Sequence, residues 1–150
     1  GKCYTLGTAL FLQSDQCFAK HFGLHLLVQA IKKYWNCFSN DQKNELKMNS
    51  LQLTQKITAD QPSFLKEKLA SLLVELTKRD WPQQWPNLIP QAISLCSTPV
   101  ATECILIFLR SIAEVARNAT VQELPRQRRL DLMSGLHNSL DQIFPLYFRI

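Results

Sequence analysis

Long apolar runs are missing from this 150-residue sequence, and so is the apolar–polar alternation that would predict a strand. No stretch approaches the roughly 20 apolar residues that a helix needs to cross a bilayer. No basic-then-apolar signal segment opens the chain. These absences exclude a membrane-inserted protein and lead us to expect a soluble, intracellular, all-α one.

Metal-site spacing is also missing, because no CxxC pair occurs among the cysteines, which are Cys3, Cys17, Cys37, Cys96 and Cys104. An odd number without such pairs fits neither a zinc site nor a complete disulfide framework, so we expect reduced, mostly buried thiols. His21 and His25 have a spacing that could hold a metal, but they lack the glutamate of HExxH and a third ligand. We predict no metal site.

The residue pairs that catalysis needs are incomplete as well. Cys17 lies four residues before His21, so a nucleophile and a base could share one helix. An orienting group and an oxyanion site would also be required, and nothing in the sequence supplies them. We therefore predict that the chain is not an enzyme and binds no cofactor of its own.

Charge is moderate: 17 basic against 12 acidic residues give a net charge of +5, which suits an acidic partner but falls short of a dedicated nucleic-acid binder. The longest basic run, formed by Arg126, Arg128 and Arg129 around a glutamine, is short. We interpret it as a solvated helix start, and an auxiliary RNA contact is the alternative.

Helical periodicity covers nearly the whole chain from Cys17 onward. Predicted caps are Ser39 or Asn40 for the second helix, Ser63 for the third and Thr98 for the fifth. In the first helix the apolar positions are Phe18, Phe22, Leu26, Ile31, Tyr34 and Trp35. The predicted helices cover 17–38, 41–58, 63–81, 86–97, 99–117 and a sixth that begins at Pro125, with 118–124 as a loop.

The sixth predicted helix begins at Pro125, because proline is favoured in the first turn of a helix. One face of this helix is expected to be apolar, and its members are Leu130, Met133, Leu136, Leu140, Ile143 and Tyr147. The last residues, FPLYFRI, continue the apolar pattern without a cap, and the first residue is not Met. We therefore expect the chain to be a piece of a longer protein.

The helices alternate between more and less apolar, and the apolar ones begin at about residues 17, 63 and 99. Helix pairs that recur at roughly 40 residues predict an α-solenoid, in which each pair buries its apolar face against the next. The predicted fold is an all-α, right-handed α-α superhelix of HEAT-like repeats, with residues 1–150 as one segment and helix pairs at about 17–58, 63–97 and 99–148. A closed helical bundle is the alternative fold.

Two Trp-Pro pairs, in the stretch RDWPQQWPNLIP, lie between leucine-rich segments. Proline disfavours a helical residue before it and is favoured in the first turn of a helix, so Pro82 should end the third helix and Pro86 should begin the fourth. Trp81 and Trp85 should then be buried against the two helices that this turn joins. The alternative, a platform for stacking bases, would need exposed rings.

The stretch KRDWPQQWP, after a leucine-rich helix, resembles the Trp-Pro signature in the exportin branch of the importin-β-like nuclear transport receptors. HFGLHLLVQAIKKYWN (21–36), ILIFLRSIAEV and LPRQRRLDL (124–132) resemble the N-terminal HEAT repeats of that branch in the same order and spacing. The resemblance covers about residues 17–148, and residues 1–16 depart from it.

This resemblance implies a receptor that shuttles between nucleus and cytoplasm and binds the GTP form of the small GTPase Ran through its N-terminal repeats. It also implies structured RNA, notably microRNA precursors, as cargo of the full-length receptor, and contacts with nuclear pore proteins. GTP would be present only through bound Ran. The principal RNA end-binding surface would lie in later repeats, so this segment is expected to bind Ran rather than cargo.

Polar stripes on the three apolar helices would line the inner surface of such a receptor. Helical-wheel positions assign them as His21, His25, Gln29, Lys32 and Asn36 on the first, Lys68, Ser71, Glu75, Lys78 and Arg79 on the third, and Glu103, Arg110, Glu114 and Arg117 on the fifth. From this ladder we take all but His21, Lys68 and Glu103 as candidate Ran-binding residues. Charges of both signs suit a protein partner better than a phosphate backbone. A helical-repeat scaffold that binds another protein without Ran is the alternative function.

Overall fold

The computed structural model describes residues 2–118 and 124–148, and these residues form helices and loops with no strand among them. The predicted all-α class is confirmed. In chain order the elements are α1 (Lys2–Gln13), α2 (Cys17–Tyr34), η1 (Trp35–Cys37), α3 (Asn40–Leu53), η2 (Thr54–Lys56), α4 (Ser63–Asp80), α5 (Leu88–Ser94), α6 (Pro99–Arg117), α7 (Arg126–Asn138), α8 (Leu140–Ile143) and η3 (Phe144–Phe148).

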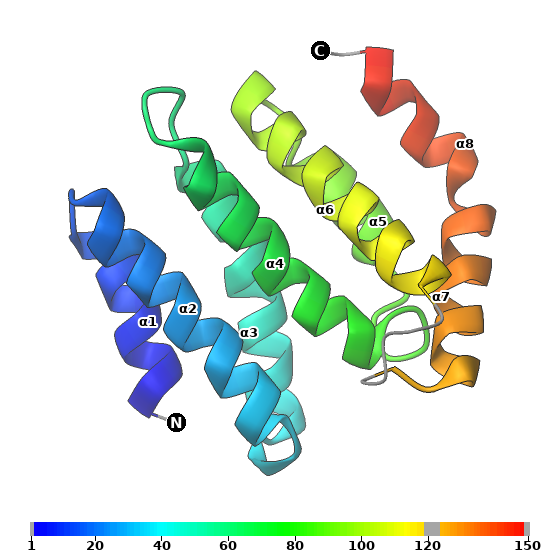
Figure 1. Cartoon of the computed structure of the whole chain (residues 1–150), viewed down its shortest axis with the longest axis horizontal. Coiled ribbons are helices and arrows are strands. Elements are labelled where there is room, and N and C mark those ends of the chain that lie inside the picture. Colours follow the sequence, from blue (N-terminus) through cyan, green and yellow to red (C-terminus); the bar gives the residue numbers. More distant parts are fainter. Residues whose placement is uncertain (1, 119–123, 149–150) are drawn as a thin grey trace.

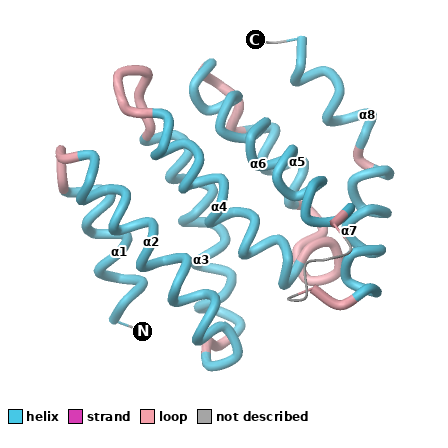
Figure 2. The backbone as a smooth tube through the Cα atoms, in the orientation of Figure 1, coloured by secondary structure: helices cyan, strands magenta, loops and turns pink. Residues whose placement is uncertain are grey.

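The helices form two layers in an open array. In the front layer of Figure 1, α2, α4 and α6 lie side by side, and α4 contacts both of the others. Helices α1, α3 and α5 lie behind them, while α7 and α8 cover the end next to α6, as the backbone trace of Figure 2 also shows. This is the arrangement of a HEAT-like repeat segment, and it does not close into the alternative bundle.

Residues 2–13, to which the sequence analysis assigned no element, form α1, which packs along α2. Two glycines allow this close packing: a Cβ at Gly23 would lie 2.5 Å from the carbonyl oxygen of Gly7, nearer than any side chain can approach. Because α1 is the neighbour of α2 in the back layer, the array begins one helix earlier than the periodicity indicated. The grouping into pairs 17–58, 63–97 and 99–148 stays a prediction.

Local capping sets two of the three predicted helix starts. The Ser39 hydroxyl accepts a hydrogen bond from the backbone N–H of Gln42 at 3.2 Å, and the Gln42 side chain accepts one from the N–H of Ser39 at 2.9 Å. The Thr98 hydroxyl accepts one from the N–H of Ala101 at 3.1 Å. The prediction that Ser63 caps the third helix was wrong. Ser63 is the first helical residue of α4, and Pro62, in an extended conformation, occupies the N-cap position.

Burial on α2 differs from the predicted face. Phe18 and Phe22 are exposed, with 82% and 53% of their surface accessible, and Tyr34 is exposed too. The predicted positions Ile31 and Trp35 are buried. The buried apolar residues of α2 are Gly23, Leu24, Leu27, Val28, Ala30 and Ile31. This stripe is selected because α1 and α4 pack against it, and the sequence of α2 alone cannot specify which of its apolar residues its neighbours cover.

The segment between α4 and α5, residues 81–87, is called the Trp-Pro loop below, and it ends α4 as predicted. Trp81 adopts an extended conformation before the cis peptide to Pro82. Pro86 does not begin the next helix. A succession of turns follows, in which the N–H of Leu88 bonds to the carbonyl of Trp85, so α5 starts at Leu88 and ends at Ser94, shorter than the predicted 86–97.

Both tryptophans are buried, as expected for a structural role, but their partners differ from those predicted. Trp85 does contact the helix that follows it, because its indole N–H donates to the Gln91 side chain at 3.0 Å. The Trp81 ring instead lies against Gly135 on α7, far along the sequence. The buried rings leave no accessible face for stacking bases.

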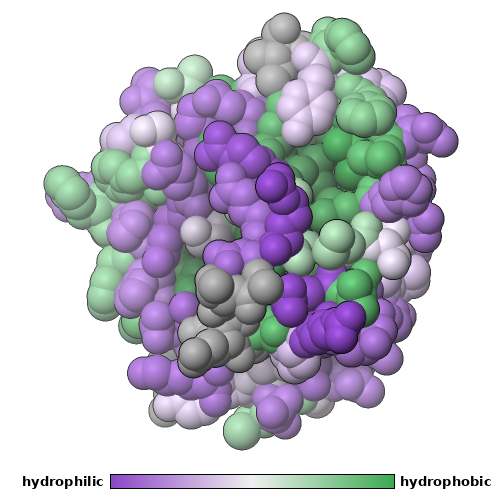
Figure 3. Space-filling view, turned by 45° about the vertical axis from the view of Figure 1, so that its right-hand side comes forward, coloured by the Kyte–Doolittle hydropathy of each residue, from purple (hydrophilic) through white to green (hydrophobic). Residues whose placement is uncertain are grey.

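The predicted sixth helix is divided at Ser139 into α7, α8 and η3, and the predicted apolar face is partly wrong. Ile143 is buried, but Leu130, Met133 and Tyr147 are exposed. The buried positions of α7 are Leu132 and Gly135 instead, and the Trp81 ring fits against Gly135 because a glycine leaves room there. Figure 3, which brings the side of these helices forward, shows a continuous apolar area beside a hydrophilic band. The predicted loop 118–124 lies mostly outside the described residues.

Candidate partner-binding surface

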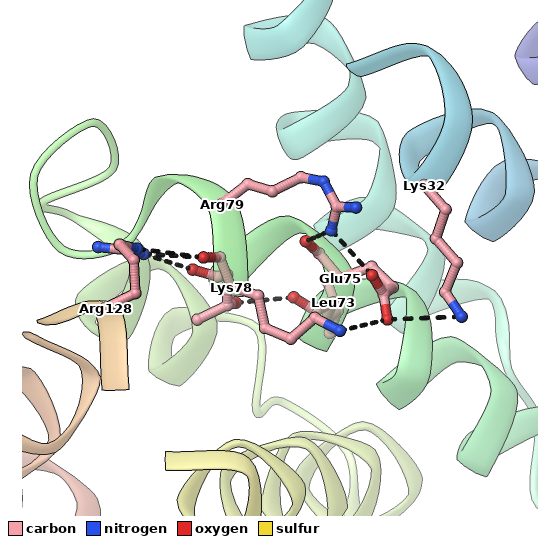
Figure 4. Close-up of polar contacts among 7 residues, drawn as sticks. Lys32, Leu73, Glu75, Lys78, Arg79 and Arg128 are labelled. Carbon is pink, nitrogen blue, oxygen red and sulfur yellow. Dashed lines mark hydrogen bonds and ion pairs between the residues drawn. The ribbon is translucent and has the colours of Figure 1, made fainter. Parts of the chain in front are cut away.

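Glu75 on α4 is the centre of a charged cluster that joins two helices of the front layer (Figure 4). Its Oε1 accepts a hydrogen bond from Lys78 Nζ at 2.8 Å, and its Oε2 accepts one from Arg79 Nη1 at 2.8 Å. Lys32 Nζ on α2 lies 4.0 Å from Oε1. The carboxylate therefore orders Lys78 and Arg79, which follow it by about one turn of its own helix, and attracts Lys32 from the neighbouring helix.

The Glu75 carboxylate is buried and ionised. Burial by itself raises the pKa of a carboxyl group, but the hydrogen bonds and charges of Lys78 and Arg79 outweigh that effect, so the pKa of Glu75 lies below its usual range. A buried carboxylate that has lost its partners would be costly, so the four side chains are energetically coupled. The cluster is thus a rigid part of the surface.

Exposure differs within the cluster and determines which groups can reach a partner. The Lys32 side chain is 42% accessible, whereas those of Lys78 and Glu75 are mostly covered. Asn36, four residues after Lys32, is also exposed. A partner approaching this face therefore meets the ammonium of Lys32 before it meets the buried carboxylate.

His25 and Lys68 continue the same face toward the other end of α2 and α4, with His25 Nδ1 3.2 Å from Lys68 Nζ. Burial and the nearby Lys68 charge lower the pKa of His25, and burial and Lys32 lower that of Lys68. Gln29, which is half-buried, lies on the same helix as His25. Ser71 is exposed, but its hydroxyl donates to the carbonyl of Glu67 on its own helix at 3.0 Å.

The predicted residues on α6 form a separate exposed group next to this cluster. Arg110 Nε lies 3.9 Å from Glu114 Oε1, and the two side chains are 72% and 69% accessible. Arg117, one turn on, is exposed as well. Because α6 packs against α4, the stripes of neighbouring helices occupy one layer of the array. The structure brings the α2 and α4 residues into direct contact and places the α6 residues on the adjacent helix.

Arg128 has a structural role that the sequence analysis did not foresee. Its guanidinium Nη2 donates to the carbonyls of Lys78 at 3.0 Å and Trp81 at 2.6 Å, where α4 ends. Carbonyls in the last turn of a helix lack partners within it, so an α7 side chain caps α4. Arg126 is exposed and Arg129 is half-buried. No local pattern marks this role, because 50 residues separate Arg128 from Lys78.

A buried ion pair below the Trp-Pro loop was also missed. Lys47 Nζ on α3 lies 2.5 Å from Asp80 Oδ2 at the end of α4, and both side chains are almost fully covered. The same ammonium donates to the carbonyl of Gln84 at 3.3 Å and lies 5.7 Å from the centroid of the Trp85 ring. Lys47 therefore ties the loop to the back layer. In the sequence of the polar helix α3, Lys47 could be recognised only as one more polar residue.

Among the residues that the structure describes, no group of three or more His, Cys, Asp or Glu side chains is placed to hold a metal ion. His21, which the sequence analysis considered as a ligand, meets the Phe64 ring edge-on, with centroids 5.4 Å apart. No helix within the described ranges is long and apolar enough to cross a membrane.

Comparison with known proteins identifies the family to which this chain belongs. Residues 62–150, more than half of the chain, match the family described as Exportin 1-like protein. The chain belongs to that family. This exportin segment is 34% identical to Exportin-5 of Dictyostelium discoideum over 98% of the chain and 31% identical to Exportin-5 of Homo sapiens over 95%. It is 26% identical to Protein EXPORTIN 1A of Arabidopsis thaliana over 85%.

The exportin segment spans only a small part of these relatives, 13% of the Dictyostelium protein and 12% of the human one. The family match includes the Trp-Pro loop and the end of α4, where the Glu75 cluster lies. The resemblance to the exportin branch is confirmed. Within that branch the four stretches also predict a likeness to exportin five, and the identities to two Exportin-5 proteins confirm it.

Proposed function

We propose that this exportin segment is part of a non-enzymatic nuclear export receptor and that it binds Ran in its GTP form through the front layer of α2, α4 and α6. The contact residues are the candidates named from the sequence: His25, Gln29, Lys32, Asn36, Ser71, Glu75, Lys78, Arg79, Arg110, Glu114 and Arg117. GTP enters the complex only with Ran, and the segment needs no cofactor of its own.

The Glu75 cluster is the observation that carries this proposal. It places one buried carboxylate, the two cations hydrogen-bonded to it and the exposed Lys32 ammonium across two neighbouring helices. Preorganised side chains lose little conformational entropy on binding, and charges of both signs match a protein surface better than a uniformly negative backbone. Arg110 and Glu114 present a further donor and acceptor on the adjacent helix.

The rest of the receptor's function rests on family membership. Relatives of this chain are named exportins, and two of those compared are Exportin-5. The full-length receptor would carry structured RNA such as microRNA precursors, contact nuclear pore proteins and shuttle between nucleus and cytoplasm. Arg126 and Arg129 offer an auxiliary RNA contact, whereas Arg128 already donates to α4 carbonyls.

A binding titration of the chain with Ran loaded with GTP or GDP tests the proposal. We expect saturable binding to the GTP form and at least about tenfold weaker binding to the GDP form, a difference of about 1.4 kcal/mol. Equal binding to both forms, or to neither, would contradict the Ran-dependent function. Binding of another protein that ignores the nucleotide would support the alternative, a helical-repeat scaffold.

A further inference from the structure

A cavity of about 720 Å³ lies where α2 and α4 end, beside the start of α7. Among the described residues that line it, Asp80 is the acidic one, and its carboxylate is already paired with Lys47 at 2.5 Å. Of the eleven lining residues within the described part of the chain, six are basic: Lys32, Lys33, Lys43, Lys78, Arg79 and Arg128. The cavity therefore concentrates positive charge from four helices, α2, α3, α4 and α7, around one hollow. Figure 4 shows Lys32, Lys78, Arg79 and Arg128 near the second half of α4.

Helix stability explains some of these cations but not all. Lys32 and Lys33 occupy the last turn of α2, where the negative end of the helix dipole favours basic residues. Lys43 is the fourth residue of α3, near the positive end of that dipole, where a cation is disfavoured. Its ammonium nevertheless lies beside the cavity, 5.3 Å from the centroid of the Trp35 ring, which also lines it. A cation–π contact with Trp35 offsets this cost and holds the Lys43 ammonium at the edge of the cavity.

The groups that remain available to a ligand are ammonium groups rather than guanidinium forks. Arg79 donates to Glu75, and Arg128 donates to the carbonyls at the end of α4. Lys32 lies no closer than 4.0 Å to its carboxylate partner. Lys33 makes no hydrogen bond or ion pair with the residues that the structure describes. Lys32, Lys33 and Lys43 can therefore turn toward a bound anion without breaking a close ion pair.

We propose that this cavity binds a polyanion that carries several phosphate groups. Lysine acts as a point charge and suits the non-planar charge distribution of a phosphate group. Planar carboxylates are best matched by the guanidinium forks of arginine, but Arg79 and Arg128 already donate to groups of the protein. The Asn36 amide in the lining adds a neutral donor. A volume of about 720 Å³ holds more than one phosphate group. This ligand is separate from the GTPase, although both would use Lys32.

Tripolyphosphate is the first probe, titrated calorimetrically into the whole chain at low, constant ionic strength. We expect one saturable site, weakened about fivefold by either Lys33→Gln or Lys43→Gln, because each removes one charge-assisted contact. Lys56→Gln is the matched control, since Lys56 is an exposed lysine on η2 that does not line the cavity. Lys33→Arg keeps the charge and should retain binding within about twofold. Circular dichroism confirms that each variant is folded.

Two further probes identify the source of the phosphate groups. A short single-stranded oligonucleotide that competes with tripolyphosphate assigns the site to a nucleic-acid backbone. Failure of the oligonucleotide to compete assigns it to a free polyphosphate. A glutamate oligomer of equal charge should bind at least about tenfold more weakly than tripolyphosphate, because its carboxylates lack available forks.

Three results would overturn the proposal: no saturable binding of tripolyphosphate, an equal loss in Lys56→Gln, or equally tight binding of the glutamate oligomer. The second would show that net charge rather than the cavity attracts the anion. No GTPase is present in these titrations. A failure to bind tripolyphosphate therefore does not contradict the proposed binding of Ran, and a failure to bind Ran does not contradict the proposed anion site.

Discussion

The ring of Trp81 lies directly on the backbone of Gly135, so that a Cβ at position 135 would be 2.5 Å from the ring atom Cη2. This contact joins the end of α4 to the middle of α7. Because both the ring and the helix backbone are confined, the pair fixes how the two elements pack.

Replacement of Gly135 by alanine tests this contact. In an exposed helix interior, Gly→Ala stabilises by about 1 kcal/mol. Here we expect Gly135→Ala to destabilise the fold by about 1 to 3 kcal/mol, because the added methyl group overpacks the Trp81 ring. Denaturant unfolding measures the change, and Ser134→Ala, at the neighbouring exposed position, should change stability by less than about 0.5 kcal/mol. Stabilisation by Gly135→Ala would contradict the packing.

Arg128 provides a second test of the junction between α4 and α7. We expect Arg128→Gln to lower the free energy of unfolding by about 1 to 3 kcal/mol, because the carbonyls of Lys78 and Trp81 lose a charged donor. Arg126→Gln removes the same charge from an exposed position and should cost less than about 0.5 kcal/mol. Thermal or denaturant melts compare the two variants. Equal effects would show that Arg128 is an ordinary surface residue.

Acid should weaken the Glu75 cluster in a defined direction. The pKa of Glu75 is below its usual value of about 4.5 in the folded protein, so its contribution to stability is fully present above that value and disappears as the pH falls through the folded pKa. We expect Glu75→Gln to destabilise the protein at pH 7, and this difference from the unmodified protein to shrink at pH 3. Denaturant melts at several pH values measure it. Glu45→Gln, which makes the same change at an exposed position on α3, should cost less than about 0.5 kcal/mol at pH 7.

Reactivity toward thiol reagents should separate the cysteines. Burial raises the pKa of the Cys104 thiol to about 12, so very little thiolate is present at pH 8, whereas Cys37 is exposed. We expect alkylation of Cys37 to be at least about 100-fold faster than that of Cys104 in the folded protein. Mass spectrometry of peptides after timed labelling gives both rates. Comparable rates without denaturant would mean that Cys104 is accessible.

Charge reversal tests the Ran-binding surface. We expect Lys32→Glu and Arg110→Glu each to weaken binding of Ran-GTP by about 1 to 3 kcal/mol, the range of desolvated interface contacts, as measured by titration. Lys56→Glu makes the same charge change away from this face and should cost no more than about 0.5 kcal/mol. Circular dichroism must show that the variants stay folded. An equal loss in all three would indicate net charge as the cause.

Local sequence signals determined several of the helix boundaries. Ser39 with Gln42, Thr98 with Pro99, and the Trp81–Pro82 step act within a few residues, so the sequence contains both partners of each interaction. The family could also be predicted from the Trp-Pro stretch and its neighbours, and the match to exportins confirms it. These features depend on short segments in which all interacting residues are neighbours in the sequence.

Tertiary packing decided which faces are buried and which polar groups meet. The sequence of α2 offers Phe18 and Phe22 as apolar residues, yet both are exposed, because α1 and α4 cover the Gly23 side instead. Likewise the sequence predicts Arg128 to be a solvated residue. Its contact with the end of α4 forms only because α7 packs there, and the carbonyl it binds, that of Trp81, is 47 residues away in the sequence. A helical pattern defines candidate stripes, but only neighbouring helices, distant in the sequence, choose among them.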